Sequence, residues 1–177
     1  GAIAVNGVEI LTARIFTRQD GIALDCFWIE HGKGILFEEE KLEKIKESIK
    51  KCLINQLNPE QELFKLYKSI HKRNIFIKTP SRVLLDNSVS NTHSVLEING
   101  RDRPGLLFNL TSKLTELGVQ IQSASVSTYG DRVVDVFYVK DIFGMKIDGL
   151  NRIKVIKEKL NSVLVETKFL EKNMKKS

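Results

Sequence analysis

The chain has 177 residues, 42% of them apolar, and a net charge of +6 from 28 basic and 22 acidic side chains. This length fits one domain or two small ones, and the apolar content excludes wholesale disorder. Charges of both signs are interspersed, so solvated helix faces explain the basic balance better than a nucleic-acid partner does. The two cysteines are too few for a zinc cluster or a disulfide framework, and no apolar run approaches the ~20 residues of a membrane span. We therefore expect a soluble, cytoplasmic protein that does not bind membranes.

The first half of the chain predicts strands and two helices. Its strand-like segments, which show extended apolar patterns, are residues 9–18, 22–30 and 75–85. Gln19-Asp20-Gly21 is a hairpin turn between the first two, and Thr79-Pro80 makes the third an edge strand or a kinked one. Residues 38–53 carry apolar side chains at helical spacing. A second helix over residues 60–71 begins after Asn58, a typical N-cap.

The second half predicts a complete alternation of strands and helices. Its strands are residues 93–99, 119–128, 133–140 and a closing strand over 165–169. Leucines at helical spacing predict a helix over residues 108–117, which Gly118 ends as a C′ glycine. A last amphipathic helix covers residues 150–163.

The two halves repeat one another. Residues 7–10 match residues 118–121 at an offset of 111, and Asp25 and Phe27 match Asp135 and Phe137 at an offset of 110. The counterpart of residues 93–117 would precede residue 1. We therefore expect the chain to be a fragment whose first copy lacks its first strand and most of its first helix.

These patterns predict an α+β protein made of two ferredoxin-like βαββαβ units. Each unit would have an antiparallel four-stranded sheet with both helices on one face, and the first would be truncated at its N-terminus. The expected division is a first domain over residues 1–85, a connector over 86–91, a second domain over 92–170 and a basic tail over 171–177.

The stretch with most chemical content is the corner between the strand at 93–99 and the helix at 108–117. Its sequence is Arg101-Asp102-Arg103-Pro104-Gly105-Leu106-Leu107. The unpaired N–H groups of a helix N-terminus bind carboxylates, and Asp102 beside them can accept hydrogen bonds from an ammonium. The corner therefore suits an α-amino acid. The residues taken alone favour a simpler interpretation, in which Asp102 caps the helix and Pro104-Gly105 shapes the turn.

Two further observations bear on the chemistry. Asp25 and Asp135 each interrupt an apolar strand face, where a charge needs a partner, and their recurrence favours a structural hydrogen bond over a unique active site. The histidines, His31, His71 and His93, are far apart and form no metal-binding motif, so we expect no metal.

The corner resembles the signature turn of ACT domains, small regulatory modules that typically bind amino acids. Residues 13–17 and 20–25, with 86–92 and 134–139, resemble the two ACT domains at the C-terminus of bacterial bifunctional uridylyltransferase/uridylyl-removing enzymes, which act on the nitrogen-signalling PII protein. The catalytic domains of that family match nothing here, and the Mg expected for them would not belong to this fragment. The resemblance implies glutamine, or another small amino acid, as ligand, and PII as the partner of the full-length enzyme.

The resemblance also implies the residues of the ligand site. They are Asp102, Arg103, Pro104, Gly105, Leu106 and Leu107 of the corner, Gln120 and Ile121 at the start of the next strand, and Glu9 and Ile10 of the first copy. No catalytic residue is expected.

Two other functions remain open from the sequence. The copies can form an interaction module without a ligand, pairing in cis or between chains. A ferredoxin-like RNA binder is the other alternative, but Phe27, Trp28, Phe137 and Tyr138 lie outside any basic-aromatic motif.

Overall fold

The computed structural model describes residues 1–17, 20, 22–30, 39–70, 81–130 and 132–165. Their helices are α1 (Ala2–Val5), α2 (Glu39–Leu53), α3 (Pro59–Ile70), α4 (Leu106–Glu116) and α5 (Leu150–Val165). Their strands are β1 (Glu9–Thr17), β2 (Ala23–Glu30), β3 (Arg82–Asp86), β4 (Ser94–Arg101), β5 (Val119–Tyr129) and β6 (Arg132–Asp141). The α+β class is confirmed, and each of these elements except the short α1 overlaps one that the sequence analysis gives by its residues.

Local signals in the sequence explain where the helices begin and end. Asn58 caps α3 as predicted, because its Oδ1 accepts the N–H of Glu60 at 3.0 Å and that of Gln61 at 3.3 Å. Gly118 follows α4 in the left-handed region, with φ +66°, as a C′ glycine should. The predicted hairpin turn at Gln19-Asp20-Gly21 lies largely outside the described residues.

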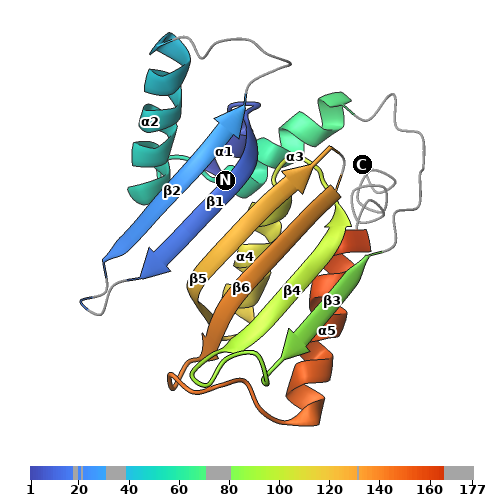
Figure 1. The fold of residues 1–177 in the computed structure, drawn as a ribbon. Coiled ribbons are helices and arrows are strands. Elements are labelled where there is room, and N and C mark those ends of the chain that lie inside the picture. Colours follow the sequence, from blue (N-terminus) through green and yellow to red (C-terminus); the bar gives the residue numbers. More distant parts are fainter. Residues whose placement is uncertain (18–19, 21, 31–38, 71–80, 131, 166–177) are drawn as a thin grey trace.

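The strands of both copies join in one antiparallel sheet of the order β2-β1-β5-β6-β4-β3 (Figure 1). The sequence predicts an antiparallel sheet for each unit, the first unit lacking one strand, and in the structure the two sheets are continuous. The reason is that β1 of the first copy pairs with β5 of the second, from Thr12 opposite Ser127 to Phe16 opposite Ser123. The two copies therefore pair in cis, edge to edge.

The register of the β1–β5 pairing, called the joint below, relates the two copies by an approximate two-fold axis. Arg14 lies opposite Ser125, which is its own counterpart at the repeat offset of 111 residues. Thr12 and Phe16, on either side, lie opposite the counterparts of one another. The start of each central strand is consequently brought toward the other copy, which places Glu9 near the end of β5.

Strand β3 occupies the outer edge beside β4, from Arg82 opposite Asn99 to Asp86 opposite Val95. Residues 82–85 were assigned to the first copy, but they complete the sheet of the second. The strand predicted over 165–169 does not begin at Val165, because α5 continues through that residue, and 166–169 lie outside the described residues. An edge strand from earlier in the chain thus takes the place in the sheet that the closing strand would have filled.

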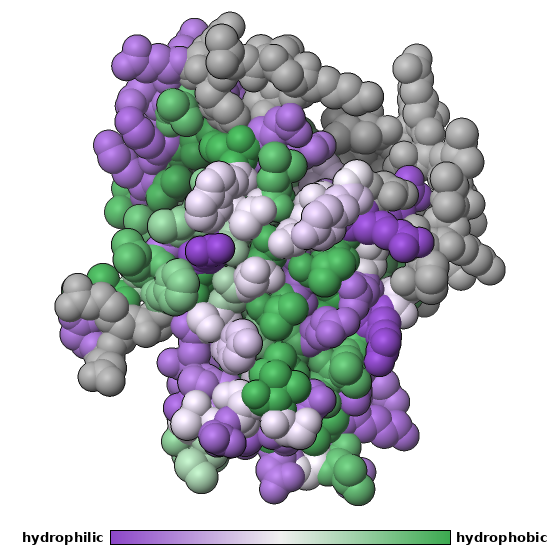
Figure 2. Space-filling view, in the orientation of Figure 1, coloured by the Kyte–Doolittle hydropathy of each residue, from purple (hydrophilic) through white to green (hydrophobic). Residues whose placement is uncertain are grey.

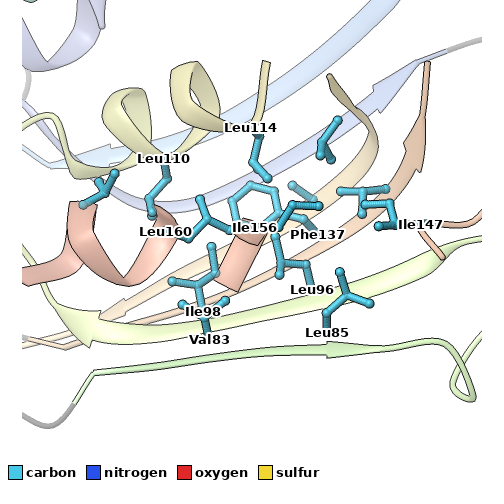
Figure 3. Close-up of a cluster of buried hydrophobic side chains, with 14 of the residues drawn as sticks. Val83, Leu85, Leu96, Ile98, Leu110, Leu114, Phe137, Ile147, Ile156 and Leu160 are labelled. Carbon is cyan, nitrogen blue, oxygen red and sulfur yellow. The ribbon is translucent and has the colours of Figure 1, made fainter. Parts of the chain in front are cut away.

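The main core lies between the second copy's part of the sheet and the two helices α4 and α5. Figure 3 shows Leu110 and Leu114 of α4 and Leu160 of α5 directed toward Phe137 of β6. Phe137 is fully buried. A smaller cluster, Ile3, Val8 and Ile45, holds the first copy together. The second copy is therefore the better-packed body, and the corner at the start of α4 is anchored in it.

The opposite face of the sheet, which is turned toward the viewer in Figure 1, carries none of the helices of the described residues. Apolar and weakly polar side chains gather along its centre in Figure 2. Trp28 of β2 lies on this face, is 52% exposed and stacks within 5.9 Å of the Arg14 guanidinium. The described helices contain no segment long and apolar enough to cross a membrane.

Candidate functional site

The corner between β4 and α4 is a tight turn with Gly105 as the N-cap of the helix, at φ +74°. A side chain is poorly tolerated at this φ, and a Cβ at Gly105 would lie only 2.7 Å from Leu63 Cδ1. Leu63 belongs to α3 and is 3% exposed. The glycine therefore allows a helix of the first copy to pack directly against the corner of the second.

A cavity of about 740 Å³ opens between this corner and the first copy. Its second-copy wall is formed by residues 101–108 with Thr111, Val126, Thr128, Gly130, Val133 and Asp135. Its first-copy wall is formed by residues 1–4, 7–10, Ile15, Phe27, Ile49 and Leu66. The size falls within the usual range of ligand pockets. Neither copy encloses this space by itself, because the walls come from both.

The cavity brings together most of the site residues implied by the sequence. Glu9 and Ile10 lie in the same cavity as Asp102, Arg103, Pro104, Gly105, Leu106 and Leu107. The joint is held by the Thr128 hydroxyl, which donates to the Ile10 carbonyl at 3.2 Å. The start of β1 is therefore part of the same site as the corner.

Gln120 and Ile121 are not brought to this cavity. They lie at the start of β5, opposite Lys140 and Val139 of β6, whereas the cavity is reached by the other end of β5 at Val126 and Thr128. By the two-fold relation of the copies, Gln120 occupies the place of Glu9 at the opposite end of the joint.

Asp102 does not cap α4. Its Oδ1 accepts the N–H of Arg103 at 2.8 Å, and Gly105, the N-cap, has no side-chain capping bond. Burial raises the pKa of Asp102 above its usual value, the Arg103 N–H opposes this, and the nearby Glu9 carboxylate raises the pKa further. The Asp102 carboxylate is therefore available to a cation in the cavity, which is the partner that would restore its ordinary pKa.

The N-terminus of α4 supplies the opposite polarity. The Leu106 N–H donates to the Arg103 carbonyl at 3.0 Å, and the Asn109 N–H begins the helical ladder by donating to Gly105 at 3.0 Å. Leu107 and Phe108 lie between them in the first turn and line the cavity. First-turn N–H groups have no acceptor within the helix and carry the positive end of its dipole, so this wall favours a carboxylate.

Arg103 is held by the fold. Its Nη2 donates to the carbonyl of Val163 at 2.8 Å, near the C-terminal end of α5. A cation at this end of a helix is favourable. The arginine thus ties the corner to α5.

Asp135 is the residue that the sequence analysis did not place in the site. It lines the cavity from β6 and is 1% exposed. The Ser127 N–H hydrogen-bonds to its carboxyl, but Oδ1 has no hydrogen-bond partner among the described residues. Burial, opposed by the Ser127 N–H and reinforced by Asp102, raises the pKa of Asp135 to about 7.

The hydrogen bond from the Ser127 N–H is the structural bond that the sequence predicts for Asp135. It leaves the Oδ1 atom of the carboxyl group without a partner among the described residues. The sequence signal that pointed to it was the charge within an otherwise apolar strand. Its counterpart, Asp25, does not line the cavity and is exposed on β2, where partial burial raises its pKa. The repeat therefore places two similar aspartates in unlike surroundings.

Within the described ranges, no group of three or more histidine, cysteine, aspartate or glutamate side chains is placed to hold a metal ion. The side chains of the cavity that carry charge are Glu9, Arg101, Asp102, Arg103 and Asp135. Such a set, beside a helix N-terminus, suits a small zwitterion rather than a metal or an extended polyanion.

The strand, the sharp Pro-Gly corner and the helix formed by β4 and α4, within an antiparallel sheet, have the arrangement of an ACT domain. Residues 89–167 match the ACR family N-terminal ACT domain, and this part of the chain belongs to the ACT family. The chain is 46% identical over 168 residues to a bifunctional uridylyltransferase/uridylyl-removing enzyme of Azospirillum brasilense. It is 45% identical over 168 residues to the enzyme of that name from Rhodospirillum rubrum, and 44% identical over 162 residues to that of Gluconobacter oxydans.

The first two of these alignments cover 94% of the chain and the third covers 90%. The chain spans only 17–18% of the length of these relatives. The similarity therefore concerns one segment of much larger enzymes.

Proposed function

We propose that this chain is the amino-acid-sensing part of a bifunctional uridylyltransferase/uridylyl-removing enzyme, and that it binds glutamine in the cavity between its two ACT units. The observation that carries the proposal is that cavity, because its second-copy wall offers helix N–H groups for a carboxylate and, beside them, Asp102 for an ammonium. The similarity to such enzymes over nearly the whole chain supports the enzymatic context.

In this proposal the enzyme acts on the PII protein in the cytoplasm. Glutamine binding favours uridylyl removal from PII, and the absence of glutamine favours uridylyl transfer. A ligand that contacts both Glu9 of one copy and Asp102 of the other would fix the angle between the copies. A change in that angle is a physical means of passing the signal on.

The direct test is thermal unfolding of the full-length protein with and without millimolar L-glutamine. A ligand that binds only the folded state at a hundredfold excess over Kd stabilises it by about 2.7 kcal/mol. Asp102→Ala should remove the shift and leave the unliganded melting temperature close to that of the wild type, because Asp102 does not cap α4. Gln120→Ala is the matched control, since Gln120 lies at the far end of β5 and should keep the full shift.

The absence of any shift with glutamine would refute the proposal. A loss of the shift in Gln120→Ala but not in Asp102→Ala would move the site to the other end of the joint.

The alternative function is an interaction module without a ligand of its own. The β1–β5 joint supports it, since it shows that these units associate through strand edges. Analytical ultracentrifugation with and without amino acids separates the two proposals. An interaction module changes its association state with protein concentration alone, whereas the sensor responds to glutamine.

A further inference from the structure

Asp135 presents a carboxyl oxygen that the fold leaves without a hydrogen bond. Its Oδ1 has no partner among the described residues, although the residue is 1% exposed. Buried polar atoms are almost always hydrogen-bonded, and an unsatisfied one calls for a specific explanation. The position of Asp135 in the wall of the cavity supplies one, since a ligand there would be the missing partner.

The charges around Asp135 determine what kind of ligand it can accept. Across the cavity, Glu9 comes from β1, and Arg101, Asp102 and Arg103 come from the corner. The neighbouring strand β5 contributes the Ser127 N–H, and on the other side β4 places the apolar Ile98 opposite. Arg103 is already bonded to Val163, and Asp102 acts on Asp135 as a like charge. A positively charged hydrogen-bond donor would give Asp135 Oδ1 its missing partner and would offset the negative charge of Asp102.

We propose that Asp135 and Asp102 together bind the ammonium group of the ligand, and that Asp135 gives up its proton to solvent when the ligand enters. This inference rests on the proposed function, since it assumes an amino acid in the cavity. It adds a binding residue on β6 and a coupling between ligand and proton. The carboxyl group of Asp135 becomes a carboxylate, the ligand enters as a zwitterion, and one proton appears in the buffer.

The proposal predicts a specific pH dependence. With a pKa of about 7 in the empty site, about a tenth of Asp135 is ionised at pH 6 and about nine-tenths at pH 8. If only the ionised form accepts the ligand, the apparent affinity is scaled by that fraction. Glutamine should therefore bind about tenfold more tightly at pH 8 than at pH 6.

The test is calorimetric titration of the full-length protein with L-glutamine at pH 6.5, in phosphate and in an imidazole buffer of larger ionisation enthalpy. The difference in heat gives the number of protons released, which should be about three-quarters per site for the wild type at this pH. Asp135→Asn should weaken binding at least tenfold, release no proton and show no rise in affinity from pH 6 to pH 8. Asp25→Asn, at the equivalent position outside the cavity, should behave as the wild type.

The ammonium is tested separately with 4-carbamoylbutanoate, which is glutamine without its amino group. It should bind weakly and without proton release, and this measurement on the wild type needs no variant to fold. If glutamine binds but releases no proton, or if Asp135→Asn binds it unchanged, the role of Asp135 is overturned and the proposed function stands. If glutamine does not bind the wild type at all, the proposed function itself fails.

Discussion

The ionisation of Asp135 should make the stability of the folded protein depend on pH even without ligand. Its pKa is about 7 in the fold, against 3.8 for an unperturbed aspartate. The folded state therefore holds a proton that the unfolded state has lost between these two values. The contribution of Asp135 to the free energy of unfolding is fully present below about pH 4. It is lost as the pH rises through the folded-state pKa of about 7.

The magnitude follows from the shift. Each pKa unit corresponds to about 1.4 kcal/mol, so the whole window is worth about 4 kcal/mol, of which about 2.6 kcal/mol falls between pH 5 and pH 8. Asp135→Asn removes the titration and keeps the shape of the side chain. The free energy of unfolding of the variant, relative to the wild type, should therefore rise by about 2–3 kcal/mol from pH 5 to pH 8.

Urea unfolding at pH 5, 6, 7 and 8, followed by circular dichroism, measures this difference directly. Asp25→Asn is the control and should show a much smaller trend in the same direction, because Asp25 is exposed. A constant difference between Asp135→Asn and the wild type over this range would show that the buried carboxyl does not titrate there. The reasoning from burial and the unpaired oxygen would then be wrong.

Two further substitutions test the packing around the site, each by urea unfolding. Gly105→Ala should destabilise the protein more than Gly144→Ala: both glycines have φ near +75°, which costs an alanine about 1 kcal/mol, but only at Gly105 does a Cβ meet Leu63. Equal losses of stability in the two variants would mean that Leu63 of α3 does not pack closely against Gly105. Phe137→Ala should cost about 3–5 kcal/mol because Phe137 is fully buried, whereas Phe27→Ala, at the equivalent but 38% exposed position, should cost less than half as much. Similar losses at the two positions would contradict the unequal packing of the two copies.

Local features of the fold could be predicted because they depend on neighbouring residues. Asn58 as a cap and Gly118 as a C′ glycine are confirmed, since each acts within a few residues of itself. The sheet order could not be predicted in this way. Whether residues 82–86 pair with the first copy or with β4 depends on which edge is vacant in space, and the alternation of side chains along a strand does not carry that information.

The site shows the same limit. The internal repeat and the family resemblance both refer to the pairing of two copies, and the structure lines one cavity with Glu9 and the corner that they name. They also predicted Gln120 as a site residue. The antiparallel pairing of β1 with β5 places Gln120 at the end of β5 that lies away from the cavity. Asp135 was noticed as an unusual charge, but the missing partner of its Oδ1 becomes visible only when strands from the whole sheet are assembled.

Strand β3 has a practical consequence for dissecting the protein. The segment that matches the ACT family model begins at residue 89, yet the sheet of that domain includes residues from 82 onward. A fragment cut at residue 89 would lose Val83 and Leu85 from the core and expose the backbone of β4 from Val95 to Asn99. Both this fragment and one that begins at residue 81 lack β1 and expose the edge of β5, but only the fragment cut at 89 also exposes β4, so it should aggregate more readily. The start of the recognisable domain in sequence is thus not the start of its folding unit.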